Sequence, residues 1–206
     1  MTTVFALVLA LTAVVPAGLR FEPWFTHRSV AVSIARVPKG IPWVRGEAEL
    51  PVSARTVLDV VTDYEGYEKF MAPAVKVVKV LGRGAEGTRL HFVWPYPFPF
   101  RNRDAVVSYR SEPSENGVFI VTWRDDARPG DPAEGVRIAR VSGETRVEPL
   151  APDRCRVTYT YLGDLGGNFP AAAEDKAWRA EPIGYLLAIR RSLGLPIPPK
   201  VPAKAE

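Results

Sequence analysis

The sequence predicts an α+β fold in which a curved antiparallel sheet wraps around one long C-terminal helix. Two strand candidates are followed by two short helical segments and then by about six further strand candidates. Turn signals such as Ser-Glu-Asn-Gly separate the later strands, and a single helical pattern over residues 170–193 closes the chain. A sheet and one helix that pack as two layers can enclose a cavity between them.

The strand candidates are short segments rich in β-branched and aromatic residues, with apolar and polar positions that alternate. The clearest is residues 155–163, where Cys155, Val157, Tyr159 and Tyr161 share one face. The full set covers residues 29–37, 43–50, 74–82, 87–94, 104–110, 117–123, 135–150 in two pieces, and 155–163.

Two short helices are expected after the second strand. Ser53 is a typical N-cap residue, and the apolar positions that follow it predict a helix that ends near Asp63. Residues 65–71 predict a second short helix, which Pro73 closes.

The last helix has one bulky side and one side with little side chain. It starts with Pro170 in the first turn, and Pro182 should interrupt its hydrogen bonds and kink it. Small residues on one side favour either close packing against the sheet or space for a bound molecule, and the pattern leaves both open. That side carries Phe169, Ala173, Ala177, Ala180, Gly184 and Leu187.

An unusual stretch, Val93-Trp-Pro-Tyr-Pro-Phe-Pro-Phe-Arg-Asn-Arg-Asp104, lies between two strand candidates. Its three prolines donate no backbone hydrogen bonds, which excludes a central strand. We therefore expect an irregular edge or loop whose aromatic side chains cap the sheet. Arg103 and Asp104 are expected to pair with each other and fix the turn.

Composition restricts the class of protein. A chain of 206 residues with 47% hydrophobic and 24% charged residues is typical of one soluble globular domain. The net charge of +4 is not gathered into a basic block, so we expect no nucleic-acid partner. The basic residues near the C-terminus are consistent with transient contact with an anionic membrane surface, or with a solvated helix face.

The first residues differ from the rest. Val4 to Val15 form an apolar run of the length found in signal peptides, and a cut after Ala17 would follow small residues. No basic residue precedes the run. Residues 1–18 are therefore predicted to be a signal peptide or an uncleaved membrane anchor, which implies export to the periplasm or the extracellular space, or anchoring. A buried N-terminal helix is the alternative.

The chain resembles a START (lipid-transfer) domain of the helix-grip (Bet v 1-like, SRPBCC) superfamily over about residues 30–193. In such domains a Trp-Pro turn, an Arg-Asp pair and a Gly-Gly-x-x-Pro turn recur, and here these are Trp94-Pro95, Arg103-Asp104 and Gly166 to Pro170. Ala105 stands where an aromatic residue is common. The resemblance implies a helix-grip fold and a START-like domain over residues 21–195. Residues 196–206 are predicted to be a Pro-rich flexible tail.

The strand alternation and the helix together predict which residues line a cavity. Tyrosines among apolar residues would orient the polar group of a lipid or sterol-like ligand, although a wholly packed core remains the alternative. We expect a monomer without a cofactor. The candidate ligand-binding residues are Leu90, Phe92, Trp94, Ala105, Val107, Tyr109, Val157, Tyr159, Tyr161, Phe169, Ala173 and Ala177.

Non-catalytic binding, with transfer left open, is the favoured function. The chain has two histidines and one cysteine and none of the common catalytic or metal-binding motifs, so neither catalytic nor metal-ligating residues are assigned. His91 is expected to face outward. Cofactor-free polyketide cyclases and aromatases of the same superfamily provide the enzymatic alternative, which needs an acid or base in the cavity. A partner-binding module built on residues 95–100 is a third possibility.

Overall fold

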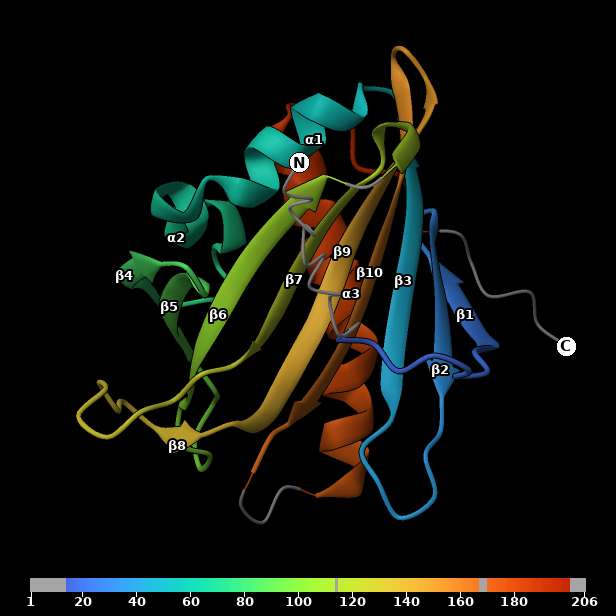
Figure 1. Ribbon diagram of the computed structural model, residues 1–206. Helices are drawn as coiled ribbons and strands as arrows, with labels where there is room; N and C mark the ends of the chain where they lie inside the picture. Colours follow the sequence, from blue (N-terminus) through green and yellow to red (C-terminus); the bar gives the residue numbers. More distant parts are fainter. Residues whose placement is uncertain (1–13, 114, 167–169, 201–206) are drawn as a thin grey trace, which may run out of the picture.

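The computed structural model of the protein describes residues 14–113, 115–166 and 170–200. Within them, ten strands form one curved sheet in the order β1-β2-β3-β10-β9-β7-β6-β5-β4, and β8 pairs with β6 off this path (Figure 1). All neighbours on the path are antiparallel, and the β6–β8 pair is parallel. The predicted α+β architecture, with a sheet curved around a long C-terminal helix, is confirmed.

The elements have the following bounds. The first half of the chain contains β1 (Glu22–His27), β2 (Val30–Ala35), β3 (Trp43–Leu50), α1 (Ala54–Thr62), a 3-10 turn (Tyr64–Gly66), α2 (Tyr67–Met71), β4 (Val77–Gly84) and β5 (Gly87–Trp94). The second half contains β6 (Arg103–Pro113), a 3-10 turn (Glu115–Gly117), β7 (Phe119–Asp125), β8 (Val136–Arg137), β9 (Ala139–Ala151), β10 (Arg154–Asp164) and α3 (Ala171–Ser192).

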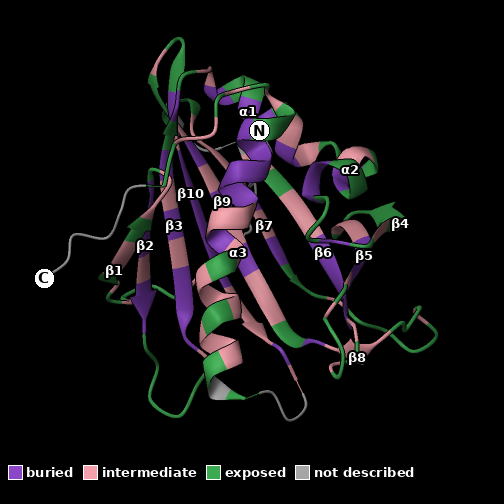
Figure 2. Cartoon of the chain, turned by 180° about the vertical axis from the view of Figure 1, so that it is seen from behind, coloured by how far each residue is buried: buried purple, intermediate pink, exposed green. Residues whose placement is uncertain are grey.

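The helices cover one face of the sheet. α3 crosses this face, and α1 and α2 contact α3 (Figures 1 and 2). Figure 2 shows that the C-terminal half of α3 is largely buried, whereas its N-terminal half carries exposed and partly exposed residues. The main core therefore lies under the C-terminal half of α3 and beside α1 and α2.

The edge strand β1 was not predicted. It contains Pro23, at a bulge in its pairing with β2, and prolines are tolerated at sheet edges. The turn to β2 consists of Arg28 and Ser29, which both have positive φ, at 49° and 59°. Hairpins usually place asparagine or glycine in such a turn, so this sequence gives no hairpin signal. The two short helices consequently follow the third strand, not the second.

The other elements agree with the prediction to within a few residues. The Ser53 side chain caps α1 by accepting a hydrogen bond from the Thr56 amide at 3.1 Å. β4 begins three residues later than expected, at Val77, and residues 135–150 form two pieces, as expected. α3 continues through Pro182 as one helix, although the proline removes one of its backbone hydrogen bonds.

His91 points away from α3, as predicted, but it is fully buried. Residues 126–135 fold over this face and contact the neighbouring Arg89 and Asp104. Ion pairs from Arg89 to Asp126 and Asp131, at 3.0 and 2.6 Å, hold that segment in place.

Arg103 and Asp104 do not pair with each other, because successive side chains of a strand point to opposite faces. The buried carboxylate of Asp104 instead contacts Arg137 at 2.7 Å and His91 at 3.2 Å. The Arg103 guanidinium donates to the Leu165 carbonyl at 2.7 Å, which ties the start of β6 to the end of β10.

Candidate functional site

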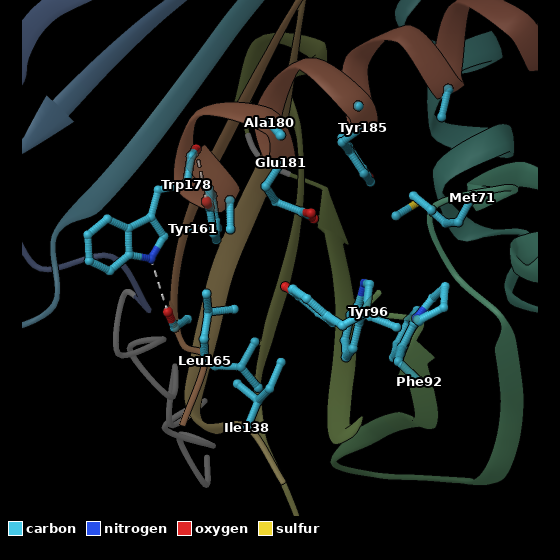
Figure 3. Close-up of a pocket in the computed structure, with 18 of the residues that line it drawn as sticks. Met71, Phe92, Tyr96, Ile138, Tyr161, Leu165, Trp178, Ala180, Glu181 and Tyr185 are labelled. Atoms are coloured by element: carbon cyan, nitrogen blue, oxygen red, sulfur yellow. Dashed lines mark hydrogen bonds between the residues drawn. The ribbon is translucent and has the colours of Figure 1, made fainter. Parts of the chain in front are cut away.

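A cavity of about 510 Å³ lies between the sheet and the N-terminal half of α3 (Figure 3). Its wall is mostly apolar and aromatic. It is lined by Tyr67, Met71, Ala74, Phe92, Trp94, Pro95, Tyr96, Pro97, Phe100, Val107, Tyr109, Trp123, Ile138, Val141, Tyr159, Tyr161, Gly163, Leu165, Ala173, Lys176, Ala177, Trp178, Ala180, Glu181, Gly184, Tyr185 and Ala188.

Stacked aromatic rings form the floor of the cavity. Tyr109 of β6 stacks on Trp123 of β7 with ring centroids 5.6 Å apart, and Trp123 stacks on Tyr159 of β10 at 5.2 Å. β9 lies between these last two strands, and it carries Gly143 opposite Trp123. A Cβ atom at position 143 would come within 2.5 Å of the indole. Glycine at this position therefore allows Trp123 to reach Tyr159 across β9.

The position of α3 explains why a cavity remains. At Gly46 of β3 the helix lies so close that an added Cβ would be 2.7 Å from the Cβ of Pro182 and 3.2 Å from Leu186. Further along the sheet the helix presents small residues, and a Cβ at Gly184 would meet no other atom within 4 Å. The helix therefore packs tightly at β3 and leaves space next to Gly184.

Pro182 also creates a link between α3 and β10. Proline has no amide hydrogen, so it cannot donate to the carbonyl of Trp178, four residues earlier. The Tyr161 hydroxyl donates to that carbonyl instead, at 3.0 Å. The Trp178 indole donates to the Gly163 carbonyl at 3.3 Å. Two hydrogen bonds therefore tie the N-terminal half of α3 to β10.

The proline-rich stretch forms one wall of the entrance. Residues 95–102 are a loop between β5 and β6, as predicted, and Tyr96 and Phe100 face the cavity. Phe98 differs, because it lies outside the lining and is 96% exposed. The expectation that all of these aromatic side chains cap the sheet was therefore wrong for Phe98.

Glu181 is the carboxyl group of the lining. Figure 3 shows it projecting from α3 into the cavity, toward Tyr96 of the entrance loop. The Tyr159 hydroxyl donates to its Oε1 atom at 3.2 Å. Burial raises the pKa of Glu181 above its usual value, and the hydrogen bond from Tyr159 opposes this shift.

The tyrosines around Glu181 keep their protons. Burial raises the pKa of Tyr159, Tyr161 and Tyr109 well above the usual value, and the Glu181 carboxyl raises it further. Tyr185 accepts a hydrogen bond from Thr145 at 3.1 Å. At neutral pH the cavity therefore offers phenolic hydroxyls and one carboxyl group.

The structure places the predicted site residues in three groups. Eight lie on the cavity wall: Phe92, Trp94, Val107, Tyr109, Tyr159, Tyr161, Ala173 and Ala177. Leu90, Ala105 and Val157 are buried in the core and do not reach the cavity. Phe169 lies outside the described residues.

Sequence reasoning did not assign Glu181 to the site. It follows Ala177 by four residues, so its spacing put it on the same side of the helix as the small residues. Trp123 and Tyr185 were also missed. Trp123 belongs to a correctly predicted strand, and the signal that would have found it is its alternation within that strand.

Other site types find little support in the described part of the chain. No group of three or more histidine, cysteine, aspartate or glutamate side chains is arranged to hold a metal ion there. In the same residues, no helix is long and apolar enough to cross a membrane. Burial raises the pKa of the Cys155 thiol to about 11, which disfavours the reactive thiolate.

Comparison with known families gives a match over most of the domain. Residues 43–183 match the family described as polyketide cyclase/dehydrase and lipid transport. None of the curated proteins compared with the chain matches it.

Solved structures share the architecture. A STAR-related lipid transfer protein from Xanthomonas axonopodis is 24% identical, with a TM-score of 0.71 over 84% of this chain and 98% of that one. Human STARD10 is 20% identical, with a TM-score of 0.71 over 84% of this chain and 75% of that one. The Zhui aromatase/cyclase from Streptomyces is 14% identical, with a TM-score of 0.55 over 75% of this chain and 94% of that one. The chain thus belongs to the polyketide cyclase/dehydrase and lipid transport family and has the helix-grip fold of START domains.

Proposed function

We propose that the protein binds a lipid or another hydrophobic small molecule in the cavity, without chemical change. The observation that carries this proposal is the aromatic cavity of about 510 Å³ between the sheet and α3. Pockets of this size typically bury most of a small ligand, and each buried methylene group contributes about 0.8 kcal/mol. The name of the Xanthomonas structure, a STAR-related lipid transfer protein, agrees with this proposal.

The cavity entrance supports transfer between a membrane and the protein. Phe98 projects from the entrance loop into solvent, where its ring is available to the acyl region of a membrane. The exposed Lys176 lines the same cavity and carries a charge that anionic headgroups attract. We propose that this loop touches the membrane surface briefly while the ligand passes between the loop and α3.

We propose the protein's cellular location from its N-terminal segment. Residues 1–18 have the pattern of a signal peptide or anchor, and residues 1–13 lie outside the described part of the chain. Anchoring, or export to the periplasm, would place the domain next to a membrane, which can supply or receive a transferred lipid.

A cofactor-free cyclase is the second candidate, and Glu181 is the observation that favours it. A carboxyl group with a raised pKa inside an apolar cavity can act as a general acid or base in an aldol-type ring closure. Such a group typically contributes about 10² to 10⁴ in rate, so Glu181→Gln would slow ring formation from a linear poly-β-keto thioester at least about 100-fold. Absence of ring products in the wild-type protein would leave binding as the function.

Displacement of a fluorescent lipid tests the binding proposal. Ala177 lines the cavity, so Ala177→Leu should weaken uptake of the probe strongly while the protein stays folded. Glu174→Gln on the same helix, outside the lining, is the matched control. Overfilling a packed core would instead cost about 1–3 kcal/mol of stability. A large drop in melting temperature with unchanged affinity would therefore contradict the proposal.

A further inference from the structure

The cavity has few polar groups in its described lining, and the two charged side chains there, Glu181 and Lys176, lie in different parts of it. Apart from tyrosine hydroxyls, the ionisable residues of the described lining are Glu181 and Lys176. Lys176 is exposed at the entrance, whereas Glu181 lies on the inner side of α3. Within the described lining, the inner part of the cavity therefore holds a carboxyl group and no cationic side chain.

No positive charge compensates Glu181 within the described residues. None of the ion pairs formed there includes it, and the group that donates to it is the neutral hydroxyl of Tyr159, at 3.2 Å. The titratable groups that face it are tyrosines from three elements and the entrance loop, which are Tyr96, Tyr109, Tyr159, Tyr161 and Tyr185. Part of the Glu181 surface meets the free space of the cavity, so the carboxyl remains accessible to a ligand.

Tyr109 supplies a complementary donor. Its ring is fixed between Trp123 and Tyr64, with centroid distances of 5.6 and 5.3 Å. Among the hydrogen bonds of the described residues, none uses its hydroxyl, whereas the hydroxyls of Tyr159 and Tyr161 both donate to protein oxygens. A ligand oxygen in the cavity can accept from Tyr109 while the ligand's own hydroxyl donates to Glu181.

A carboxyl group without a cation discriminates between ligand headgroups. A hydroxyl donor gains a hydrogen bond and relieves part of the desolvation cost of Glu181. A carboxylate or phosphate would place a second negative charge beside it in an environment of low dielectric constant. Building on the proposed lipid-binding function, we propose that the cavity selects uncharged amphiphiles whose buried end is a hydroxyl group, and that Glu181 and Tyr109 recognise this group.

The volume agrees with a single chain or a fused ring system. The cavity of about 510 Å³ lies within the range of roughly 300–1,000 Å³ that is typical of small-molecule sites. This range suits one long-chain alcohol or a compact sterol-like alcohol.

Competition between matched ligands tests the proposal. The reporter is diphenylhexatriene, an apolar fluorophore without hydrogen-bonding groups, and the competitors at pH 8 are hexadecan-1-ol and hexadecanoic acid. The alcohol should displace the reporter from the wild-type protein with at least tenfold higher affinity than the acid. Glu181→Leu should abolish this preference, because a hydrogen bond to a charged group contributes at least about tenfold. Glu181→Gln should strengthen binding of the acid, and Tyr109→Phe should weaken binding of the alcohol several-fold.

The reporter separates this inference from the proposed function. If the reporter binds but the alcohol and the acid compete equally in wild-type protein, the headgroup selection is wrong and lipid binding stands. If the preference survives Glu181→Leu, the selection does not come from Glu181 and the assignment is overturned. If neither the reporter nor any competitor binds, both proposals fail. Glu174→Gln, which changes a carboxyl outside the lining, should leave the preference unchanged.

Discussion

Substitution of Gly184 should stabilise the fold and weaken ligand binding at the same time. Gly184 lies inside α3 and on the cavity wall, and a Cβ atom added there would meet no other atom within 4 Å. Its backbone is helical, so a side chain introduces no strain. Gly184→Leu therefore places a leucine side chain in the space proposed for the ligand.

The two effects can be estimated separately. Replacing glycine by a good helix former within a helix gains about 0.8–1 kcal/mol, which raises the melting temperature of a domain of this size by about 2–4 °C. Beyond its Cβ, leucine adds three carbon atoms to the cavity. Each displaces about one methylene of ligand, worth about 0.8 kcal/mol, so the loss is about 2.4 kcal/mol, or about 50-fold in Kd.

Thermal unfolding and reporter titration measure the two effects on the same sample. Gly46→Ala is the control, because its Cβ would lie 2.7 Å from Pro182 and should cost about 1–3 kcal/mol of stability. A lower melting temperature for Gly184→Leu, together with unchanged ligand affinity, would show that this part of α3 is packed and not part of a binding cavity.

Three further predictions address the entrance, the outer face and the N-terminus. Phe98→Asp should weaken association with anionic liposomes about tenfold in a flotation assay. Reporter affinity should stay constant, because Phe98 is 96% exposed and lies outside the lining. Equal flotation of both proteins would exclude Phe98 as a membrane contact. Burial raises the pKa of Asp104, but hydrogen bonds from Arg137 and His91 outweigh it and leave the pKa below its usual value. The charged carboxylate therefore stabilises the fold above the unfolded-state pKa of about 3.9, and this contribution is lost as the pH falls through the lower folded-state value. Denaturant unfolding should show Asp104→Asn less stable than wild type at pH 7, with a gap that narrows below about pH 4; a gap that is independent of pH would contradict this. Finally, N-terminal sequencing of protein from the native host should give a start near Gly18 or Leu19 if the segment is cleaved, whereas intact Met1 in a soluble cytoplasmic fraction would refute export.

Local patterns were sufficient for most of the fold. The alternation in residues 155–163 and 87–94 depends only on neighbouring positions, and these residues form β10 and β5 with small or no shifts of boundary. Capping by Ser53 is also a local interaction, between residues three positions apart. These elements were therefore accessible from sequence alone.

Features that depend on distant contacts were not accessible. His91 alternates as an outward residue, and its burial results from residues 126–135, which no local pattern assigns to that face. Asp104 pairs with Arg137, 33 positions away, and not with its neighbour Arg103. β1 has no turn signal because Arg28 and Ser29 adopt positive φ without the usual glycine or asparagine.

The cavity residues show the same division. Alternation placed Tyr109, Tyr159 and Tyr161 on the face that lines the cavity, but it also selected Leu90 and Ala105, which lie on the same face outside the lining. Which part of that face stays open depends on the position of α3, and that position is set by its close approach to Gly46 of β3. This contact joins Gly46 to Pro182, which lie far apart in the chain, and such a contact leaves no periodic signal in the sequence.

The most direct test of lipid binding is native mass spectrometry of the purified full chain, followed by extraction and identification of whatever it carries. The account predicts a mass increment that corresponds to one hydrophobic molecule, small enough for a cavity of about 510 Å³ and released by organic solvent. Protein that carries no such molecule, and that takes up none from vesicles or from added long-chain alcohols, would contradict it.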